Sequence, residues 1–169
     1  MTRLLGIDVG ERRLGLAVAD APDGRALPLV TITRSREIEP ELAALARVVA
    51  EQGIGEIVVG LPLEASGAEG PQAAITRAWV EGVASRLGLP VSMRDERLSS
   101  HLAEQRVGPM KRGRSGGPPT PTQRLSYRSR IDREAAAIIL QDELDARAAR
   151  ESAPATDDRT TTNEMESSG

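Results

Sequence analysis

The sequence predicts an α/β fold, with a mixed five-stranded sheet that carries helices on both faces. Three short runs typical of β-strands open the chain, and turn residues end the first two. After them, apolar stripes of helical spacing alternate with brief apolar runs that suit buried strands. The resulting order is βββαβαβα, in which a strand meander continues through right-handed βαβ crossovers.

The first three strands are expected at residues 4–9, 14–19 and 27–33. Apolar and small residues alternate along the second of these runs, and residues 20–24 that follow it are rich in turn formers. Short connections between the runs predict an antiparallel meander.

The remaining elements follow from helix start and stop signals. Glu39 and Pro40 resemble a helix start, with proline at the first helical position, and Gly53 and Gly88 are placed to end two helices. The expected elements are a helix from 39 to 52, a strand at 57–59, a loop at 60–70, a helix up to 87, a strand at 90–93, a short helix at 100–107, a loop rich in proline, glycine and basic residues, and a final helix at 131–148.

The length of 169 residues suits one domain, which we expect to span residues 1–150. Residues 151–169 lack apolar periodicity and are rich in Ser, Thr and acidic side chains, so a disordered acidic tail is expected there. The formal net charge is −3, but five acids and one arginine in this tail leave the remaining 150 residues at +1.

Composition excludes several classes of function. The chain has no cysteine, so disulfides, zinc–thiolate sites and thiol nucleophiles are absent. No run approaches the ~20 apolar residues of a membrane span, so we expect a cytoplasmic protein without a membrane partner. Trp79 and Tyr127 are the only aromatic residues, and this composition argues against an aromatic platform for single-stranded bases.

Acidic residues lie at the ends of three of the predicted elements, at positions where they can meet. Asp8 ends the first strand, the triplet Asp95-Glu96-Arg97 follows the fifth strand, and Asp132 begins the final helix. Each has a purely structural alternative: an Asx turn at Asp8, a turn or cap at Asp95 with Arg97 paired to it, and an acid favoured by the helix dipole at Asp132.

Taken together, these acids predict a cation site at one rim of the sheet. Clustered carboxylates repel one another unless a cation neutralises them, and hard oxygen ligands select Mg²⁺ or Mn²⁺. A pair of such ions can activate water and stabilise the leaving oxygen of a phosphodiester. The only histidine, His101, is expected to be an exposed helix residue, with a role in proton transfer left open.

The segment from Gln105 to Ile131 has the character of a phosphate-binding loop. It contains no acid, and its glycines and prolines predict mobility. A mobile basic segment beside an acidic pocket suits a polyanion such as nucleic acid, although a solvated surface loop is the alternative. Its seven basic residues are Arg106, Lys111, Arg112, Arg114, Arg124, Arg128 and Arg130.

Four spaced motifs resemble the YqgF/RuvX-like family of pre-16S rRNA nucleases, relatives of RuvC-type Holliday-junction resolvases. The resemblance covers roughly residues 4–145. The matching stretches are GIDVG at 6–10 with RLGLAVAD at 13–20, VVGLPL at 58–63 with Gly67 and EGPQA at 69–73, DERLS at 95–99, and Ile131-Asp132 through ILQ at 139–141.

The resemblance implies a ribonuclease-H-like fold with Asp8, Glu96 and Asp132 as catalytic and metal-binding acids. It also implies that Arg13 or Arg97 contacts phosphate, and that the protein trims the 5′ end of the 16S rRNA precursor in the cytoplasm. The basic loop is longer and richer in Pro and Gly than the short basic stretch usual in the family, which bears on substrate preference.

Three other functions are compatible with parts of the sequence. Resolution of DNA junctions would use the same acids on a branched substrate. A non-catalytic nucleic-acid-binding assembly factor would bind without cleaving. An actin-, Hsp70- or sugar-kinase-like domain would share the GIDVG motif, but the chain has no room for the second domain that those proteins need. Either a monomer or a homodimer fits the sequence, because no heptad or evident apolar stripe marks an interface.

Overall fold

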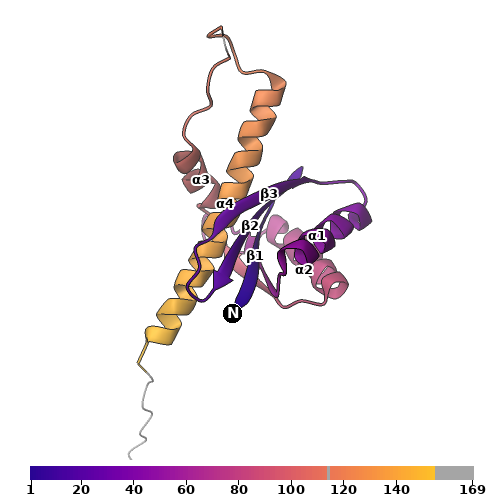
Figure 1. The fold of residues 1–169 in the computed structure, drawn as a ribbon, viewed down its shortest axis with the longest axis vertical. Helices are drawn as coiled ribbons and strands as arrows, with labels where there is room; N and C mark the ends of the chain where they lie inside the picture. The colour runs from indigo at the N-terminus through magenta and orange to yellow at the C-terminus, as the bar shows by residue number, and fades with distance from the viewer. Residues whose placement is uncertain (114, 155–169) are drawn as a thin grey trace, which may run out of the picture.

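The fold was analysed in a computed structural model that describes residues 1–113 and 115–154. Nine elements follow one another in these described residues, and Figure 1 shows their arrangement. They are β1 (Thr2–Val9), β2 (Arg13–Ala21), β3 (Leu27–Thr33), α1 (Ile38–Gln52), β4 (Glu56–Leu61), α2 (Pro71–Leu87), β5 (Val91–Asp95), α3 (Ser99–Val107) and α4 (Pro121–Ser152).

The five strands form one mixed sheet in the order β3-β2-β1-β4-β5. The pairs β1–β2 and β2–β3 are antiparallel, whereas β4 and β5 join in parallel through helical crossovers. The predicted fold class, with its meander and crossovers, is therefore confirmed. In β1 the carboxyl end carries Asp8, which pairs with Gly15 of β2.

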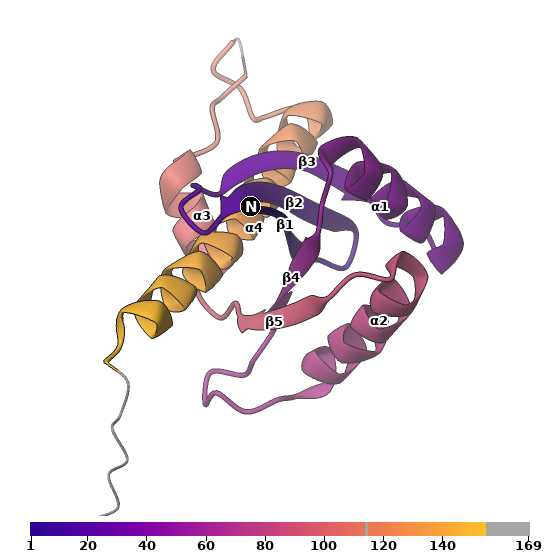
Figure 2. The ribbon, with the colours of Figure 1, turned by 60° about the horizontal axis from the view of Figure 1, so that its bottom comes forward.

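Helices cover both faces of the sheet, as Figure 2 shows, with α1 and α2 on one face and α4 on the other. Alternate residues of β1 divide between two cores. Leu5 and Ile7 are buried against α1 and α2, whereas Leu4 is buried against α4. Side chains on a strand alternate between faces, so Gly6 and Asp8 also face α4.

Small residues on this second face let α4 approach the strands closely. A Cβ atom at Gly6 would lie 2.8 Å from the Leu140 Cβ, and one at Gly15 would lie 2.0 Å from the Asp132 carbonyl oxygen. The buried middle of α4 is itself rich in alanine, from Ala135 to Ala137. This close contact brings the α4 backbone beside the carboxyl end of β1.

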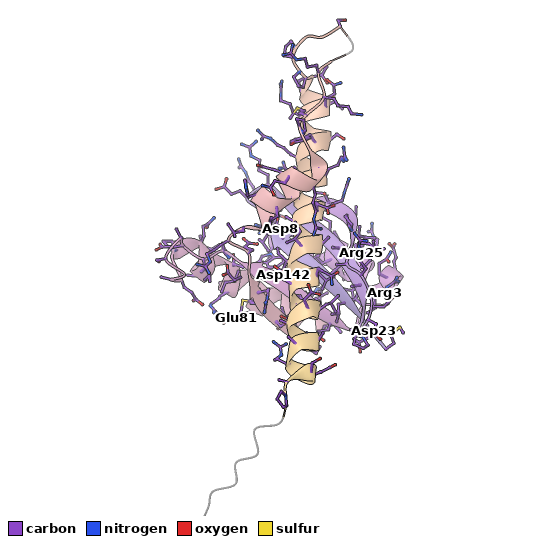
Figure 3. All side chains as sticks on the ribbon, turned by 90° about the vertical axis from the view of Figure 1, so that its left-hand side faces the viewer. Arg3, Asp8, Asp23, Arg25, Glu81 and Asp142 are labelled. Atoms are coloured by element: carbon purple, nitrogen blue, oxygen red, sulfur yellow. The ribbon has the colours of Figure 1, made fainter. Side chains whose placement is uncertain are left out.

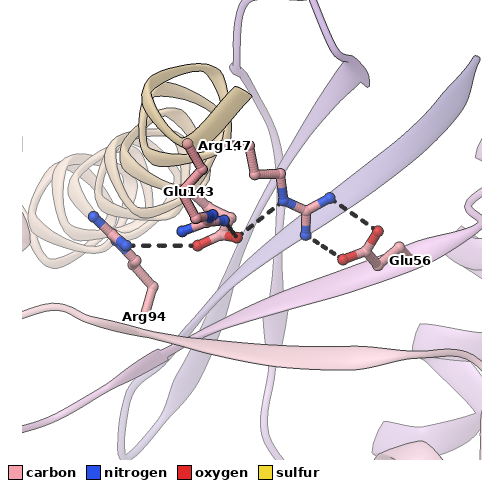
Figure 4. Close-up of polar contacts among 5 residues, drawn as sticks. Glu56, Arg94, Glu143 and Arg147 are labelled. Carbon is pink, nitrogen blue, oxygen red and sulfur yellow. Dashed lines mark hydrogen bonds and ion pairs between the residues drawn. The ribbon is translucent and has the colours of Figure 1, made fainter. Parts of the chain in front are cut away.

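An ion-pair network fastens the other half of α4 to the sheet (Figure 4). The Arg147 guanidinium donates to both carboxylate oxygens of Glu56 on β4 and, over 2.9 Å, to Glu143. Arg94 of β5 lies 3.7 Å from the other Glu143 oxygen. Glu143 is buried, so these partners stabilise a charge that would otherwise be costly inside the protein.

The largest departure from the predicted elements is the length of α4. It begins at Pro121, ten residues before the predicted start, and spans ~48 Å at the usual helical rise. Its start is a complete capping box: the Thr120 hydroxyl accepts from the Gln123 N–H over 3.2 Å, and the Gln123 side chain accepts from the Thr120 N–H over 2.8 Å.

The carboxyl end of α4 bears on the predicted domain limits. The helix continues through Glu151 and Ser152, the first residues of the predicted tail, whereas residues 155–169 of that tail lie outside the described residues.

Among residues 1–113 and 115–154, none of the helices has the length and apolar character that crossing a bilayer requires.

Candidate active site

Asp8 is the buried centre of the candidate site. It lies one residue before the end of β1, and its exposed fraction is only 8%. Its partner on the neighbouring strand β2 is Gly15. A tight turn follows β1, and in this turn the Gly10 N–H donates to the Arg13 carbonyl. Figure 3 shows Asp8 beside α4. An acid in this position is costly unless another group stabilises its charge.

Glu96 reaches the same place from the end of β5. Its N–H donates to the Leu61 carbonyl over 3.2 Å, and its carbonyl accepts from Ser99, which opens α3. The side chain lies over Gly60 of β4, where a Cβ atom would come within 2.2 Å of the Glu96 Oε2. This oxygen is buried and has no hydrogen-bond partner within residues 1–113 and 115–154.

The two carboxyl groups perturb each other's protonation. Burial raises the pKa of Asp8 to about 6, contact with the Glu96 carboxyl lowers it in part, and the charge of Asp132 raises it further. Burial, followed by the charge of Asp8, raises the pKa of Glu96 to about 8. Near pH 7, the pair therefore holds about one proton, and a cation that bound to the pair would displace this proton.

Asp132 lies on the third side of the site, but it is engaged by Arg13. The Arg13 Nε donates to the Asp132 Oδ2 over 2.5 Å, and both side chains are mostly buried. Because α4 begins at Pro121, Asp132 stands three turns inside the helix, and the helix-dipole alternative for this residue is wrong.

These residues fit a divalent cation in part. The carboxyl groups of Asp8 and Glu96, one of whose oxygens is buried without a hydrogen-bond partner among the described residues, form a hard donor set of the kind that Mg²⁺ and Mn²⁺ prefer. In the described part of the chain, no three histidine or carboxylate side chains are grouped closely enough to hold a metal ion together. Asp132 would join Asp8 and Glu96 as a ligand if it exchanged Arg13 for the cation.

Next to Glu96, Asp95 has the structural role offered as its alternative. Its carboxylate accepts from the Arg97 N–H over 3.0 Å and from the Arg97 Nε over 2.8 Å. A further Arg97 nitrogen lies 3.5 Å from the carbonyl of Ala65 in the β4–α2 loop. Arg97 is exposed beside the site, where a phosphate can reach it.

The predicted mobile loop is in large part helix. Arg124, Arg128 and Arg130 project from the first three turns of α4, and Arg106 lies on α3, where it pairs with Glu134 over 3.0 Å. We call residues 108–130, apart from Arg114, the basic arm. Figure 1 shows that the basic arm extends beyond the end of the sheet.

Basic side chains of the basic arm are open to solvent, which is what phosphate binding requires. The exposed ones are Lys111, Arg112, Arg124, Arg128 and Arg130, whereas Arg114 lies outside the described residues. A groove of ≈ 500 Å³ between the 108–120 segment and α4 is lined in part by Lys111, Tyr127 and Arg130. Tyr127 also links the two walls of the groove, because its hydroxyl donates to the Gly108 carbonyl over 2.8 Å.

Sequence reasoning named Arg13 and Asp132 but missed the contacts that shape the site and pair its charges. The pairing of Arg13 with Asp132 joins positions 119 residues apart, which no local pattern reveals. The role of Gly15 has a visible signal, because small residues occupy alternate positions of β2 and predict a closely packed face. His101 is exposed on α3 and contacts Gln105, as expected for a helix surface residue.

Comparison with known proteins places the chain among curated sequences of one name. A relative from Chloroflexus aggregans, named "Putative pre-16S rRNA nuclease", is 46% identical over 144 residues, which are 85% of this chain and 94% of the relative. A relative of the same name from Anaeromyxobacter dehalogenans is 43% identical over 146 residues, which are 86% and 98% of the two chains.

Solved structures support the fold. Thermus thermophilus RuvC superposes with a TM-score of 0.51 at 20% identity, over 88% of this chain and 97% of RuvC. RuvC from the same organism in complex with a Holliday junction substrate gives a TM-score of 0.50 at 18% identity, over the same shares. The predicted ribonuclease-H-like fold is therefore confirmed.

The family is shown by a direct match. The family model RuvX, described as Holliday junction resolvase, matches residues 2–146, which contain Asp8, Glu96 and Asp132. This match and the curated relatives confirm the predicted family and the reaction class, a nuclease-type hydrolase that acts on ester bonds. The chain belongs to the RuvX family.

Proposed function

We propose that this protein is a metal-dependent endonuclease in which Asp8, Glu96 and Asp132 form the catalytic set. The observation that carries the proposal is the buried pair of coupled carboxyl groups, Asp8 and Glu96, at the carboxyl ends of β1 and β5. Burying two acids together is costly, and a divalent cation between them offsets that cost.

The chain's own residues would divide the work as follows. Asp8 and Glu96 would hold the cation, and Asp132 would join them if Arg13 turned from it to a substrate phosphate. Such an ion, when bound, would lower the pKa of a water and offset the charge on the leaving oxygen of the phosphodiester. Arg13 and Arg97, at two sides of the acids, hold the phosphate in place and neutralise part of its charge.

The substrate we favour is the 16S rRNA precursor, cut at its 5′ end in the cytoplasm. The names of the curated relatives support it. The exposed basic side chains of the basic arm suit a long polyanion, since each contact to a phosphate releases counterions. This function is compatible with either a monomer or a homodimer.

Branched DNA is the second candidate substrate. The description of the matching family model, Holliday junction resolvase, supports it, and the fold resembles RuvC. Cutting a two-fold symmetric junction at paired positions calls for two active sites, so this function requires a homodimer.

Cleavage assays test both the chemistry and the substrate. Purified protein would be incubated with labelled precursor-like RNA, unstructured RNA and a four-way DNA junction, each with Mg²⁺, Mn²⁺ or EDTA. Asp8→Asn is the inactive variant, and Glu81→Gln is the matched control, because Glu81 is an exposed acid of α2 that Figure 3 places apart from Asp8. We expect metal-dependent cleavage by the wild type and the control only, with precursor-like RNA cut fastest.

Two outcomes would change the assignment. Faster cleavage of the junction than of either RNA would favour resolution of DNA junctions. Binding without cleavage under every condition, identical for wild type and Asp8→Asn, would contradict the nuclease and indicate a nucleic-acid-binding assembly factor, a role compatible with an Asp132 that stays paired to Arg13.

A further inference from the structure

The turn between β1 and β2 carries two residues of the candidate site on its two sides. Asp8 precedes the turn and Arg13 ends it, and the hydrogen bond from Gly10 N–H to the Arg13 carbonyl closes it. Glu11 and Arg12 at its tip are exposed. A turn with only this internal bond needs support from outside if Asp8 and Arg13 are to keep a fixed separation.

Arg34, the residue directly after β3, supplies that support through both backbone and side chain. Its N–H donates to the Arg12 carbonyl over 2.8 Å, which extends the β2–β3 pairing to the tip of the turn. Its Nη1 donates to the Gly10 carbonyl over 2.8 Å. One residue therefore holds the turn at two carbonyls, on both sides of its tip.

The guanidinium of Arg34 is itself fixed by a buried carboxylate. Its Nε donates to the Glu41 Oε2 over 2.9 Å, and Nη2 lies 3.4 Å from the Oε1. The Glu41 side chain on α1 is only 2% exposed. Its Oε1 also accepts from the Trp79 indole N–H on α2 over 2.6 Å, and the guanidinium stands 5.9 Å from the centre of that indole ring.

A carboxylate this deeply buried on the first turn of a surface helix is unusual and calls for a reason. Fastening α1 to α2 does not require it, because Arg86 and Glu39 already join the same two helices with an exposed pair at 2.7 Å. The buried pair instead connects the helical layer to the turn beside Asp8. The planar fork of arginine can reach both acceptors at once, whereas a lysine ammonium on one stem cannot hold them in the same geometry.

We propose that Arg34, oriented by Glu41 and Trp79, is a positioning residue that fixes the β1–β2 turn and so sets the placement of Asp8 and Arg13 relative to the scissile phosphate. Arg34 does not touch the reacting atoms. It acts through the Gly10 and Arg12 carbonyls, so its loss slows the chemical step while leaving the basic arm and its grip on nucleic acid intact. The inference rests on the proposed nuclease function for its kinetic consequence, but not for its structural one.

The test uses Arg34→Lys, with Arg86→Lys as the matched control, since both change an arginine that pairs with a glutamate of α1. Two quantities are measured for each: amide hydrogen exchange of peptides that cover residues 10–13, and kcat and KM on the substrate that the wild type cleaves fastest. We expect faster exchange at 10–13 in Arg34→Lys, with kcat about 10- to 100-fold lower at nearly unchanged KM. Arg86→Lys should match the wild type in both.

The two readouts separate this inference from the nuclease assignment. If the wild type cleaves no nucleic acid, the proposed function fails, yet faster exchange at 10–13 in Arg34→Lys alone still supports the positioning role. Exchange in Arg34→Lys equal to that in Arg86→Lys would overturn it, whatever the activity. If Arg34→Lys unfolds at too low a temperature to assay, Glu41→Gln replaces it in the test. Glu41→Gln keeps an oxygen acceptor for Arg34 but removes the ion pair, so we then expect the same effects at a smaller size.

Discussion

Removing one of the two coupled acids should stabilise the protein in the absence of metal. Burial and the charge of Asp8 raise the pKa of Glu96 from 4.5 to about 8, so the folded state binds more protons than the unfolded state between those values. Below pH 4.5 the carboxyl is protonated in both states and costs nothing. As the pH rises from 4.5 to 8, the unfolded state loses its proton first, and stability falls.

The size of the effect follows from the same two values. Each unit of pKa shift corresponds to ~1.4 kcal/mol, so at pH 7, where the unfolded chain would ionise Glu96 and the folded state keeps it protonated, the shift costs up to ~3 kcal/mol. Asp8 shares this cost, and we therefore expect Glu96→Gln to raise the free energy of unfolding by ~1–3 kcal/mol at pH 7.5. In a domain of this size that is a rise in Tm of ~2–12 °C.

Urea unfolding with EDTA present, at pH 5.0 and pH 7.5, measures this difference. Glu81→Gln is the control, and as a surface change it should stay within ~0.5 kcal/mol of the wild type at both values. The expected gain for Glu96→Gln is largest at pH 7.5 and small at pH 5.0. A gain of equal size at both pH values, or none at pH 7.5, would refute the argument that a buried, repelling carboxylate pair destabilises the metal-free protein.

Three further predictions concern the surroundings of the acids and the basic arm. Gly60→Ala should destabilise the protein by ~1–3 kcal/mol in thermal unfolding and abolish most cleavage, because its Cβ would come within 2.2 Å of the Glu96 Oε2, in a carboxyl group that we propose to be catalytic. Gly82→Ala, whose Cβ meets nothing nearer than 3.8 Å, should do neither. Arg13→Gln should bind Mn²⁺ more tightly in calorimetry, since it frees a carboxylate for the cation, while nucleic-acid affinity falls; weaker Mn²⁺ binding would contradict this. Arg128→Gln should reduce the slope of log K against log salt by about one, with Arg47→Gln on α1 unchanged; equal slopes would remove Arg128 from the interface.

The sheet and its two cores could be predicted from the sequence because alternation along a strand is a local signal. Leu5 and Ile7 alternate with Leu4 and Gly6, and this pattern alone divides β1 between two helical layers. The meeting of Asp8 with the acids after β5 was also predictable, since the carboxyl ends of parallel strands lie at one edge of a sheet.

The start of α4 was predictable in principle and was nevertheless misplaced. Thr120, Pro121 and Gln123 form a standard N-terminal signature, but Pro118 and Pro119 directly before them mark the segment as a loop. The first three turns of the helix bury no side chain, so no apolar period revealed them. Their helicity depends on capping and on continuity with the buried part of α4.

The charge pairs of the site could not be predicted, because they depend on contacts between distant segments. Glu41 in the first turn of α1 resembles a solvated acid that favours the helix dipole. Only the fold shows that it is buried beneath Arg34 and Trp79. Asp132, likewise, could be assigned to the acid cluster from the sequence but not to its partner Arg13.

A measurement of Mn²⁺ binding tests the central claim most directly. Electron paramagnetic resonance detects the binding as a loss of the free-ion signal. The wild type, Asp8→Asn and the Glu81→Gln control would be titrated at pH 8. This pH is close to the pKa of Glu96, so the cation can readily displace the proton that the Asp8–Glu96 pair holds. The account predicts saturable binding to the wild type and the control, and its loss in Asp8→Asn. Equal binding to all three, or none to the wild type, would contradict a cation site built on Asp8 and Glu96.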